Sequence, residues 1–156
     1  MRGFLYDAWA FVALCNSADS HHAAAAGLDL ELERRGYVGV TTDHVFDETL
    51  TWLHRAAGSR VALVFADLFA ARVAADDLLL VEVNGVRRAQ ALALFRRLSR
   101  EEPRLSFTDC TSFAVMHELG LELAFTADQH FHRAGKRVRP LLVGERDRLV
   151  ARLPAD

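Results

Sequence analysis

The sequence predicts a single three-layer α/β domain, in which helices cover both faces of a mostly parallel β-sheet. Short β-forming segments alternate with longer helix-forming ones, and this alternation is typical of a chain that returns repeatedly to one parallel sheet. The length of 156 residues fits one domain, and an apolar content of 51% is enough for a sizeable core. Neither a repeat nor a linker is visible, so residues 1–156 are assigned to one domain.

The first half of the chain contains two β-forming segments, each followed by helical sequence. Gly36 and Gly58 each follow a helical pattern and predict helix ends, and Thr42 predicts the N-cap of the helix after the second strand. The expected elements are a strand at Gly3–Tyr6, helices at Ala8–Asn16 and His21–Arg35, a strand at Tyr37–Thr41 and a helix from Thr42 to Ala57.

The second half continues the alternation with three further helices, a helical turn and three strands. Gly120 and Gly135 are the expected stops of helical segments. The expected elements are a helix at Ser59–Ala75, a strand at Leu78–Val83, helices at Gly85–Arg100 and Ser106–Leu119, a strand at Glu122–Thr126, a helical turn at Gln129–Ala134 and a strand at Val138–Val143.

Hydropathy and cysteine usage indicate a cytosolic protein. The longest apolar runs are of strand length, which is too short to cross a membrane, and Asp7 interrupts the N-terminus too early for a secretion signal. Cys15 and Cys110 each lie within an apolar helical pattern, so we expect buried thiols and no disulfide.

The net charge of −2 does not by itself indicate a nucleic-acid-binding protein, but the basic residues are unevenly placed. Six arginines lie between positions 87 and 104, and four basic residues lie between positions 133 and 139. Such stretches are most often solvated faces. If they bind RNA phosphates, the candidates are Arg87, Arg88, Arg133 and Arg137.

Two aspartates follow predicted strands. Asp7 comes directly after the first strand, and Asp128 follows the strand Glu122–Thr126 by two residues. Ligands of open α/β sheets bind beyond the carboxyl ends of the strands, so both side chains are candidates for a functional site. The alternative for each is capping of the helix that follows.

Glu48 is the third candidate and lies in the helix after the second strand. At about 100° per residue it lies roughly 40° from Trp52 and 60° from Val45, so we expect it to be partly buried at the border of the apolar face. Asp47 points farther from that face. The alternative for Glu48 is a salt bridge with an arginine at the rim of the core.

Asp109 is the fourth candidate. Ser106-Phe107-Thr108-Asp109 has the form of a capping box, which is a sufficient structural reason for the acid. Asp109 also shares a helix face with Phe113 and Met116, however, so it begins a stripe of residues that points inward, and the helix N-terminus favours its charged form.

Four carboxylates that converge on one sheet edge repel one another. At 4 Å and an effective dielectric constant of about 20, one pair costs roughly 4 kcal/mol. A fold keeps such a cluster only if protons or a cation neutralise it. Mg²⁺ and Mn²⁺ suit ligand sets made of oxygen atoms.

The order and spacing of these acids resemble PIN domains of the VapC-toxin kind. The resemblance rests on Leu5-Tyr6-Asp7, on the segment from Thr41 to Thr49, and above all on the segment from Leu105 to Met116 and its continuation Leu123-Ala124-Phe125-Thr126-Ala127-Asp128-Gln129-His130-Phe131. It covers nearly the whole chain.

The resemblance implies a metal-dependent endoribonuclease, the toxin of a type II toxin–antitoxin system. Asp7, Glu48, Asp109 and Asp128 would bind Mg²⁺ or Mn²⁺, and Thr126 would be a polar residue beside the site. The implied partners are an RNA substrate, a cognate antitoxin and a second copy of the chain. The non-enzymatic alternative is a PIN-like module that only binds RNA or protein; the presence of all four acids argues against it.

Two other classes of site are less well supported. The spacing Asp128-x-His130-x-His132 could indicate zinc, but a two-residue spacing within a short helix spreads the side chains over different faces. A phosphate-receiver domain would need an acidic pair near the start of the chain, and no acid precedes Asp7.

Overall fold

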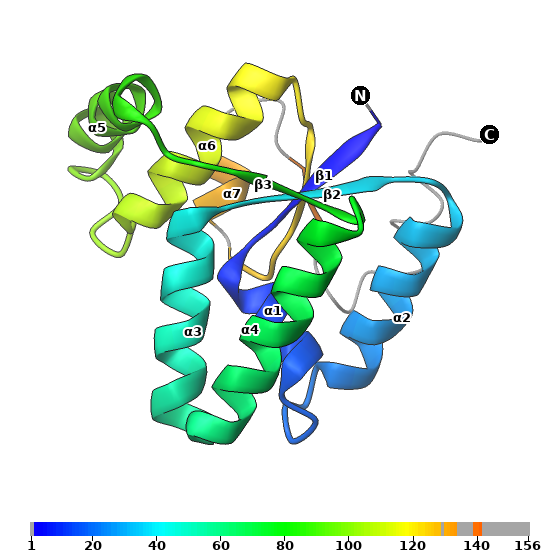
Figure 1. The fold of residues 1–156 in the computed structure, drawn as a ribbon. Helices are drawn as coiled ribbons and strands as arrows, with labels where there is room; N and C mark the ends of the chain where they lie inside the picture. Colours follow the sequence, from blue (N-terminus) through cyan, green and yellow to red (C-terminus); the bar gives the residue numbers. More distant parts are fainter. Residues whose placement is uncertain (1, 129, 134–138, 142–156) are drawn as a thin grey trace.

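A five-stranded parallel sheet forms the centre of the computed structural model, which describes residues 2–128, 130–133 and 139–141 (Figure 1). The strand order is β3–β2–β1–β4–β5, and every neighbouring pair is parallel, which confirms the predicted sheet. The strands are β1 (Gly3–Tyr6), β2 (Val38–Thr42), β3 (Leu78–Val81), β4 (Leu123–Phe125) and β5 (Arg139–Leu141).

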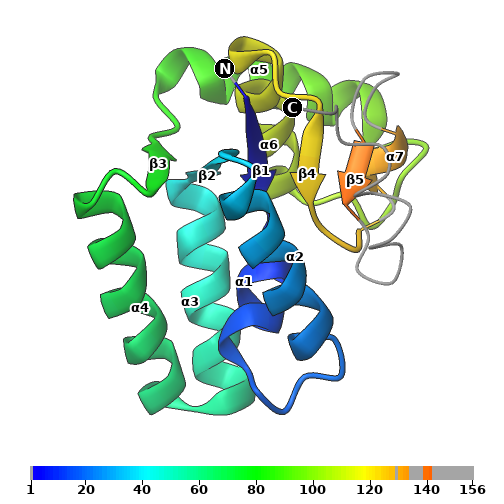
Figure 2. The same cartoon turned by 90° about the vertical axis from the view of Figure 1, so that its right-hand side faces the viewer.

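Helices cover both faces of this sheet, which confirms the three-layer architecture (Figure 2). One apolar core lies beneath α1 (Ala8–Cys15), α2 (His22–Arg34), α3 (Asp43–Ala57) and α4 (Ser59–Ala74). The other lies beneath α5 (Gly85–Leu98), α6 (Phe107–Leu119) and α7 (His130–Arg133).

The central strand β1 supplies both cores. Phe4 and Tyr6 belong to the core under α1–α4, whereas Leu5 belongs to the core under α5–α7. Successive side chains of a strand point to opposite faces, so a strand that is apolar throughout can be buried on both sides. All four residues of β1 are buried.

The residues that begin and end α3 and that end α6 are those that the sequence predicts. Thr42 accepts a hydrogen bond from the backbone N–H of Val45 (3.1 Å) and caps α3, and Gly58 and Gly120 follow helix ends with φ angles of 89° and 65°. The predicted strand Leu78–Val83 is two residues too long, because the N–H of Val83 donates to the side chain of Asp43 (2.9 Å).

The other boundaries differ from the sequence-based ones by at most two residues where they can be compared. Of the predicted strand Val138–Val143, the part that is described is β5, and its flanks lie outside the described residues. Both cysteines are free thiols, as expected; Cys110 is buried and Cys15 is partly buried. Within the described ranges, no helix is both long enough and apolar enough to cross a bilayer.

Tyr6 connects β1 to two helices. Its hydroxyl donates a hydrogen bond to Asp29 of α2 and accepts one from Nη2 of Arg72 of α4 (3.1 Å). Its ring lies against Gly39 of β2: a Cβ built on Gly39 would come within 2.4 Å of the Tyr6 ring. Glycine is therefore required at position 39 by the space that the ring occupies.

We predict that Gly39→Ala lowers the free energy of unfolding by about 1–3 kcal/mol, the usual cost of overpacking a core. The ring cannot move away easily, because Asp29 and Arg72 hold its hydroxyl. Denaturant unfolding measures the change. Gly85→Ala is the matched control, because a Cβ there meets nothing within 4 Å and alanine favours the first turn of α5. Equal stability of the two variants would contradict the close approach.

Candidate metal centre

Strand register places Asp7 beside Thr126. Tyr6 of β1 is paired with Phe125 of β4, so the residues that follow these strands emerge together at the carboxyl edge of the sheet. The Thr126 hydroxyl donates to Oδ2 of Asp7 (2.7 Å) and accepts from the backbone N–H of Asp128 (2.9 Å). Asp7 also accepts from the N–H of Ala8 (2.8 Å) and is the N-cap of α1. Asp7 therefore caps a helix and also faces the site.

The capping box of α6 fixes Asp109. The Ser106 hydroxyl accepts from the N–H of Asp109 (3.0 Å), and Oδ2 of Asp109 accepts from the N–H of Ser106 (2.8 Å). Asp109 is 7% exposed, as is Asp7. The predicted box is thus confirmed, and it holds the carboxylate in one orientation at the buried start of the helix.

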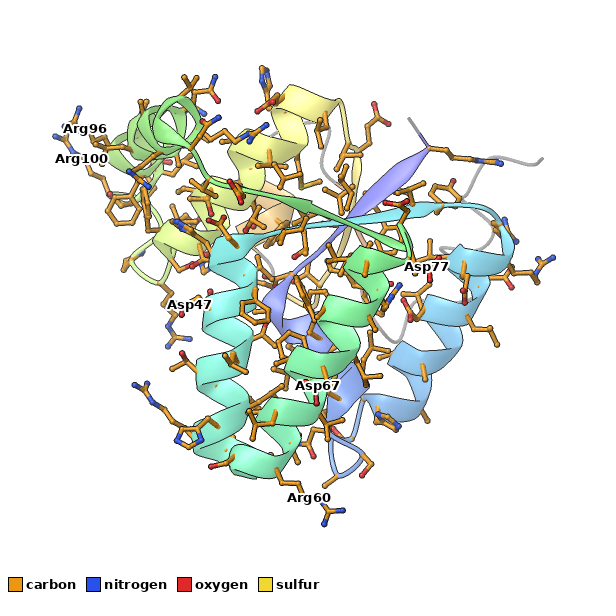
Figure 3. The ribbon with its side chains drawn as sticks, in the orientation of Figure 1. Asp47, Arg60, Asp67, Asp77, Arg96 and Arg100 are labelled. Carbon is orange, nitrogen blue, oxygen red and sulfur yellow. The ribbon has the colours of Figure 1, made fainter. Side chains whose placement is uncertain are left out.

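Glu48 lies near Asp109 but is exposed, so the expectation of partial burial was wrong. The buried face of α3 consists of Val45, Thr49 and Leu53, and Trp52, against which Glu48 was expected to pack, is 47% exposed. The apolar face is therefore narrower than the sequence suggests. The charge of Glu48 nevertheless contributes to raising the pKa of Asp109, so the two acids are electrostatic neighbours. Asp47 lies on the outward side of α3 (Figure 3).

His130 also belongs to the cluster. Its Nδ1 lies 3.0 Å from Oδ1 of Asp128 and 4.0 Å from Oδ2 of Asp109, while its Nε2 lies 3.7 Å from Oε2 of Glu102. The expectation that a spacing of two separates Asp128 from His130 was wrong, because Asp128 precedes α7 and His130 is its first residue. The side chain of His132 lies outside the described part of the chain.

Burial and like charge raise the pKa values of the two buried acids. The pKa of Asp7 rises from 3.8 to about 7, mainly because its carboxylate is desolvated, and further because Asp109 and Asp128 lie nearby. The hydrogen bonds from Thr126 and Ala8 oppose this rise. Desolvation also raises the pKa of Asp109, with contributions from Asp128 and Glu48. Asp7, Asp109 and Asp128 thus lie close enough to interact, and Glu48 is connected to this group through Asp109.

The cluster fits a divalent cation. One ligand atom each of Asp109, Asp128 and His130 lies within 4.8 Å of the others, and Asp7 interacts electrostatically with both aspartates. Carboxylate oxygens are the preferred ligands of Mg²⁺ and Mn²⁺, and a cation would stabilise the charged forms of Asp7 and Asp109, which burial and, to a lesser extent, the neighbouring acids disfavour. On the protein side, the ring nitrogens of His130 lie within 4.0 Å of carboxylate oxygens of Asp109, Asp128 and Glu102.

The arginines proposed for RNA binding differ in their surroundings. Arg87 makes a bidentate bridge to Glu118 (2.8 Å for each nitrogen) and donates to the carbonyl of Glu82, so its guanidinium joins α5 to α6. Arg88 is exposed. The side chain of Arg133 and the whole of Arg137 lie outside the described residues. Arg96, near the end of α5, and Arg100, just after it, project outward from this end of the molecule (Figure 3).

Two polar residues of this region are not identified by sequence reasoning. The zinc pattern that contains His130 is weak. The signal that could have identified His130 as a site residue is its position two residues after Asp128, an aspartate at the end of a strand. Ser112 lies three residues after Asp109, and its buried hydroxyl has no hydrogen-bond partner among the residues described. Nothing in its spacing distinguishes Ser112 from an ordinary helix residue.

Comparison with known proteins connects this geometry to a family. The family model described as "PIN domain" matches residues 4–137. The chain is 36% identical over 134 residues to the 23S rRNA-specific endonuclease VapC20 of two Mycobacterium tuberculosis strains, which covers 85% of this chain and 93% of the relative.

Solved structures give the same fold. The crystal structure of Mycobacterium tuberculosis VapC20, described as a Sarcin-Ricin loop cleaving toxin, superposes with a TM-score of 0.72 at 31% identity and covers 85% of this chain and 95% of its own. VapBC2 from Rickettsia felis, bound to a DNA fragment from its promoter, has a TM-score of 0.65 at 12% identity, with 88% and 96% covered. At that identity the second likeness concerns the fold alone.

We predict that Asp7→Asn raises the melting temperature of the metal-free protein at pH 8. At this pH the wild type buries a charged Asp7, whereas asparagine keeps the volume and can still cap α1. A difference of one pKa unit between the folded and the unfolded chain corresponds to about 1.4 kcal/mol. Removing the buried charge therefore raises the free energy of unfolding by more than the loss of about 1 kcal/mol that a disturbed Thr126 hydrogen bond causes.

The sign of the pH effect follows from the raised pKa. Between pH 4 and pH 7 the folded wild type binds a proton at Asp7 that the unfolded chain does not, so its stability falls as the pH rises. The advantage of the variant is therefore largest at pH 8, shrinks as the pH falls through 7, is much smaller at pH 5 and disappears near pH 4. Calorimetry in EDTA at pH 8 and pH 5 measures this, and a variant that melts well below wild type at pH 8 would make Asp7 a purely structural residue.

Proposed function

We propose that this chain, which belongs to the PIN-domain family, is an endoribonuclease that hydrolyses RNA phosphodiester bonds. The observation that carries the proposal is the meeting of Asp7, Asp109 and Asp128 at the carboxyl edge of the sheet. The similarity to a ribosomal-RNA endonuclease extends over most of both chains and supports the same activity. The chain acts as the toxin of a toxin–antitoxin pair.

Asp7, Glu48, Asp109 and Asp128 hold Mg²⁺ or Mn²⁺ in this proposal. Asp7 and Asp109 are fixed by hydrogen bonds from backbone N–H groups at the starts of α1 and α6, whereas Glu48 is exposed. When bound, the ion lowers the pKa of a water molecule and stabilises charge that develops on the phosphate. The ligands come from four separate segments, so the site forms only in the folded chain.

The protein residues orient the groups around the reacting phosphate. The Thr126 hydroxyl donates to the carboxylate of Asp7 and accepts from the backbone N–H of Asp128, so one side chain connects the segments that carry these two acids. RNA brings further negative charge to a cluster that is already anionic, so a cation at the cluster would strengthen RNA binding as well as support hydrolysis. A histidine or serine nucleophile is not required.

The partners follow from the same family membership. RNA is the substrate, a cognate antitoxin covers the site, and two copies of the chain form a homodimer. The 36% identical relative is named for its action on 23S rRNA, so a ribosomal RNA fragment is the first substrate to test. The alternative, a silent RNA- or protein-binding module, would keep the fold and bind RNA or protein without cleaving RNA, and an RNA cleavage assay separates the two.

We predict that the purified chain cleaves RNA in Mg²⁺ or Mn²⁺ and not in EDTA. Glu48→Gln should abolish cleavage, because it removes one charged ligand at nearly constant shape. Asp47→Asn is the matched control in the same helix; it should stay within a few-fold of wild type, since Asp47 lies on the outward side of α3. Gel analysis of an RNA pool and mapping of the cut ends provide the measurement.

Two results would contradict this mechanism. Cleavage that persists in EDTA and leaves a cyclic phosphate would exclude a metal-dependent hydrolysis. Equal losses in Glu48→Gln and Asp47→Asn would mean that the face of α3 directed to the site is assigned wrongly. Absence of cleavage under every metal condition, with RNA binding retained, would favour the silent module.

We further predict that Arg88→Ala flattens the salt dependence of RNA binding by about 0.7 in the slope of log K against log [salt], the effect of one lost phosphate contact on a single strand. Arg88 is exposed on α5, and Arg60, at the far end of α4, is the control (Figure 3). Binding is measured in EDTA so that no RNA is cut. Unchanged slopes in both variants would assign Arg88 to the ordinary solvated surface.

A further inference from the structure

The ring of His130 presents its two nitrogens to different carboxylates. Nδ1 faces Asp128 and Asp109, at 3.0 Å and 4.0 Å, and Nε2 faces Glu102, at 3.7 Å. The side chains of His130 and Glu102 are each 17% exposed, so both lie mostly inside the protein. The backbone N–H of His130 also donates to Oδ1 of Asp128 (2.8 Å), which ties the start of α7 to the acid that precedes it.

These distances suit a shared cation. Metal–ligand bonds of about 2.1 Å place neighbouring ligand atoms roughly 3 Å apart and opposite ones roughly 4 Å apart. The separations from Nδ1 to the two aspartate oxygens are 3.0 Å and 4.0 Å. A histidine that binds a metal usually donates the N–H of its other ring nitrogen to a carboxylate, and Glu102 lies on that side of the ring.

We propose that His130 is a direct ligand, through Nδ1, of the divalent ion held by Asp109 and Asp128, and that Glu102 orients its ring. The proposal rests on the metal centre of the proposed function and adds to it a nitrogen ligand. Ligation through Nδ1 leaves the ring proton on Nε2, where it faces Glu102. Carboxylate sets serve Mg²⁺ and Mn²⁺ alike, whereas an imidazole nitrogen favours the transition ions. His130 therefore biases this centre toward Mn²⁺ over Mg²⁺.

Electron spin-echo spectroscopy of the Mn²⁺-loaded full chain tests the proposal directly, because a bound imidazole couples a ¹⁴N nucleus to the ion. Wild type should show this coupling, and labelling histidine with ¹⁵N should replace it. His130→Asn should lose it, since asparagine keeps a polar group near Asp128 without the ring. His54→Asn, at the exposed end of α3, is the matched control and should keep it.

Affinity provides a second readout. His130→Asn should bind Mn²⁺ at least tenfold more weakly, measured from the signal of free Mn²⁺, and should lose less affinity for Mg²⁺ in competition. Glu102→Gln should keep the coupling and weaken Mn²⁺ binding about tenfold, the effect of losing an outer partner. The metal-free melting temperature of each variant shows whether it is folded; if His130→Asn does not fold, His130→Gln is measured in its place.

Absence of ¹⁴N coupling in Mn²⁺-loaded wild type, or its persistence in His130→Asn, overturns the proposal. RNA cleavage in Mn²⁺ is measured on the same samples. Wild type that cleaves RNA without the coupling would leave the proposed function intact and refute only the role of His130. Wild type that binds Mn²⁺ with the coupling but does not cleave RNA would refute the proposed function and leave the ligand assignment standing.

Discussion

The parallel pairing of β1 with β4 is the constraint on which the site depends. It brings Asp7 and Thr126 to one place although 119 positions separate them, and the Thr126 hydroxyl then ties Asp7 to the backbone of Asp128. Since β1 is the central strand, buried on both faces, Asp7 is desolvated at the point where the sheet ends. The helices α3 and α6 add their acids from the same edge, and His130 of α7 completes the group.

This arrangement is costly for the metal-free protein and useful for its chemistry. The acids keep their orientation because the backbone holds two of them: Asp7 caps α1, and Asp109 closes the capping box of α6. The same contacts prevent the carboxylates from turning away from one another, so their repulsion persists until a proton or a cation neutralises it. Stability is exchanged here for a preformed anionic site, as is common where function concentrates like charge.

Local signals were sufficient to predict the sheet and the helices, and they single out the four acids as candidates. Strand-end aspartates, a Thr cap before α3 and the Ser106–Asp109 box are each visible within a few residues. The exposure of Glu48 was not predictable in the same way, because it depends on how much of α3 the neighbouring helices cover. The place of His130 depends on where α7 begins, and helix boundaries are the least certain part of a sequence-based prediction.

The central claim is that a divalent cation replaces protons on a converged carboxylate cluster, and calorimetry of metal binding tests it most directly. The pKa of Asp7 in the metal-free protein is about 7, so the binding of Mg²⁺ at pH 6.5 must displace a proton. The heat of binding should therefore differ between two buffers of unequal ionisation enthalpy at pH 6.5. This difference should shrink toward zero at pH 9 and be reduced in Asp7→Asn. Binding heats that are independent of the buffer at pH 6.5 would contradict the claim, because Asp7 would then be charged before the ion arrives.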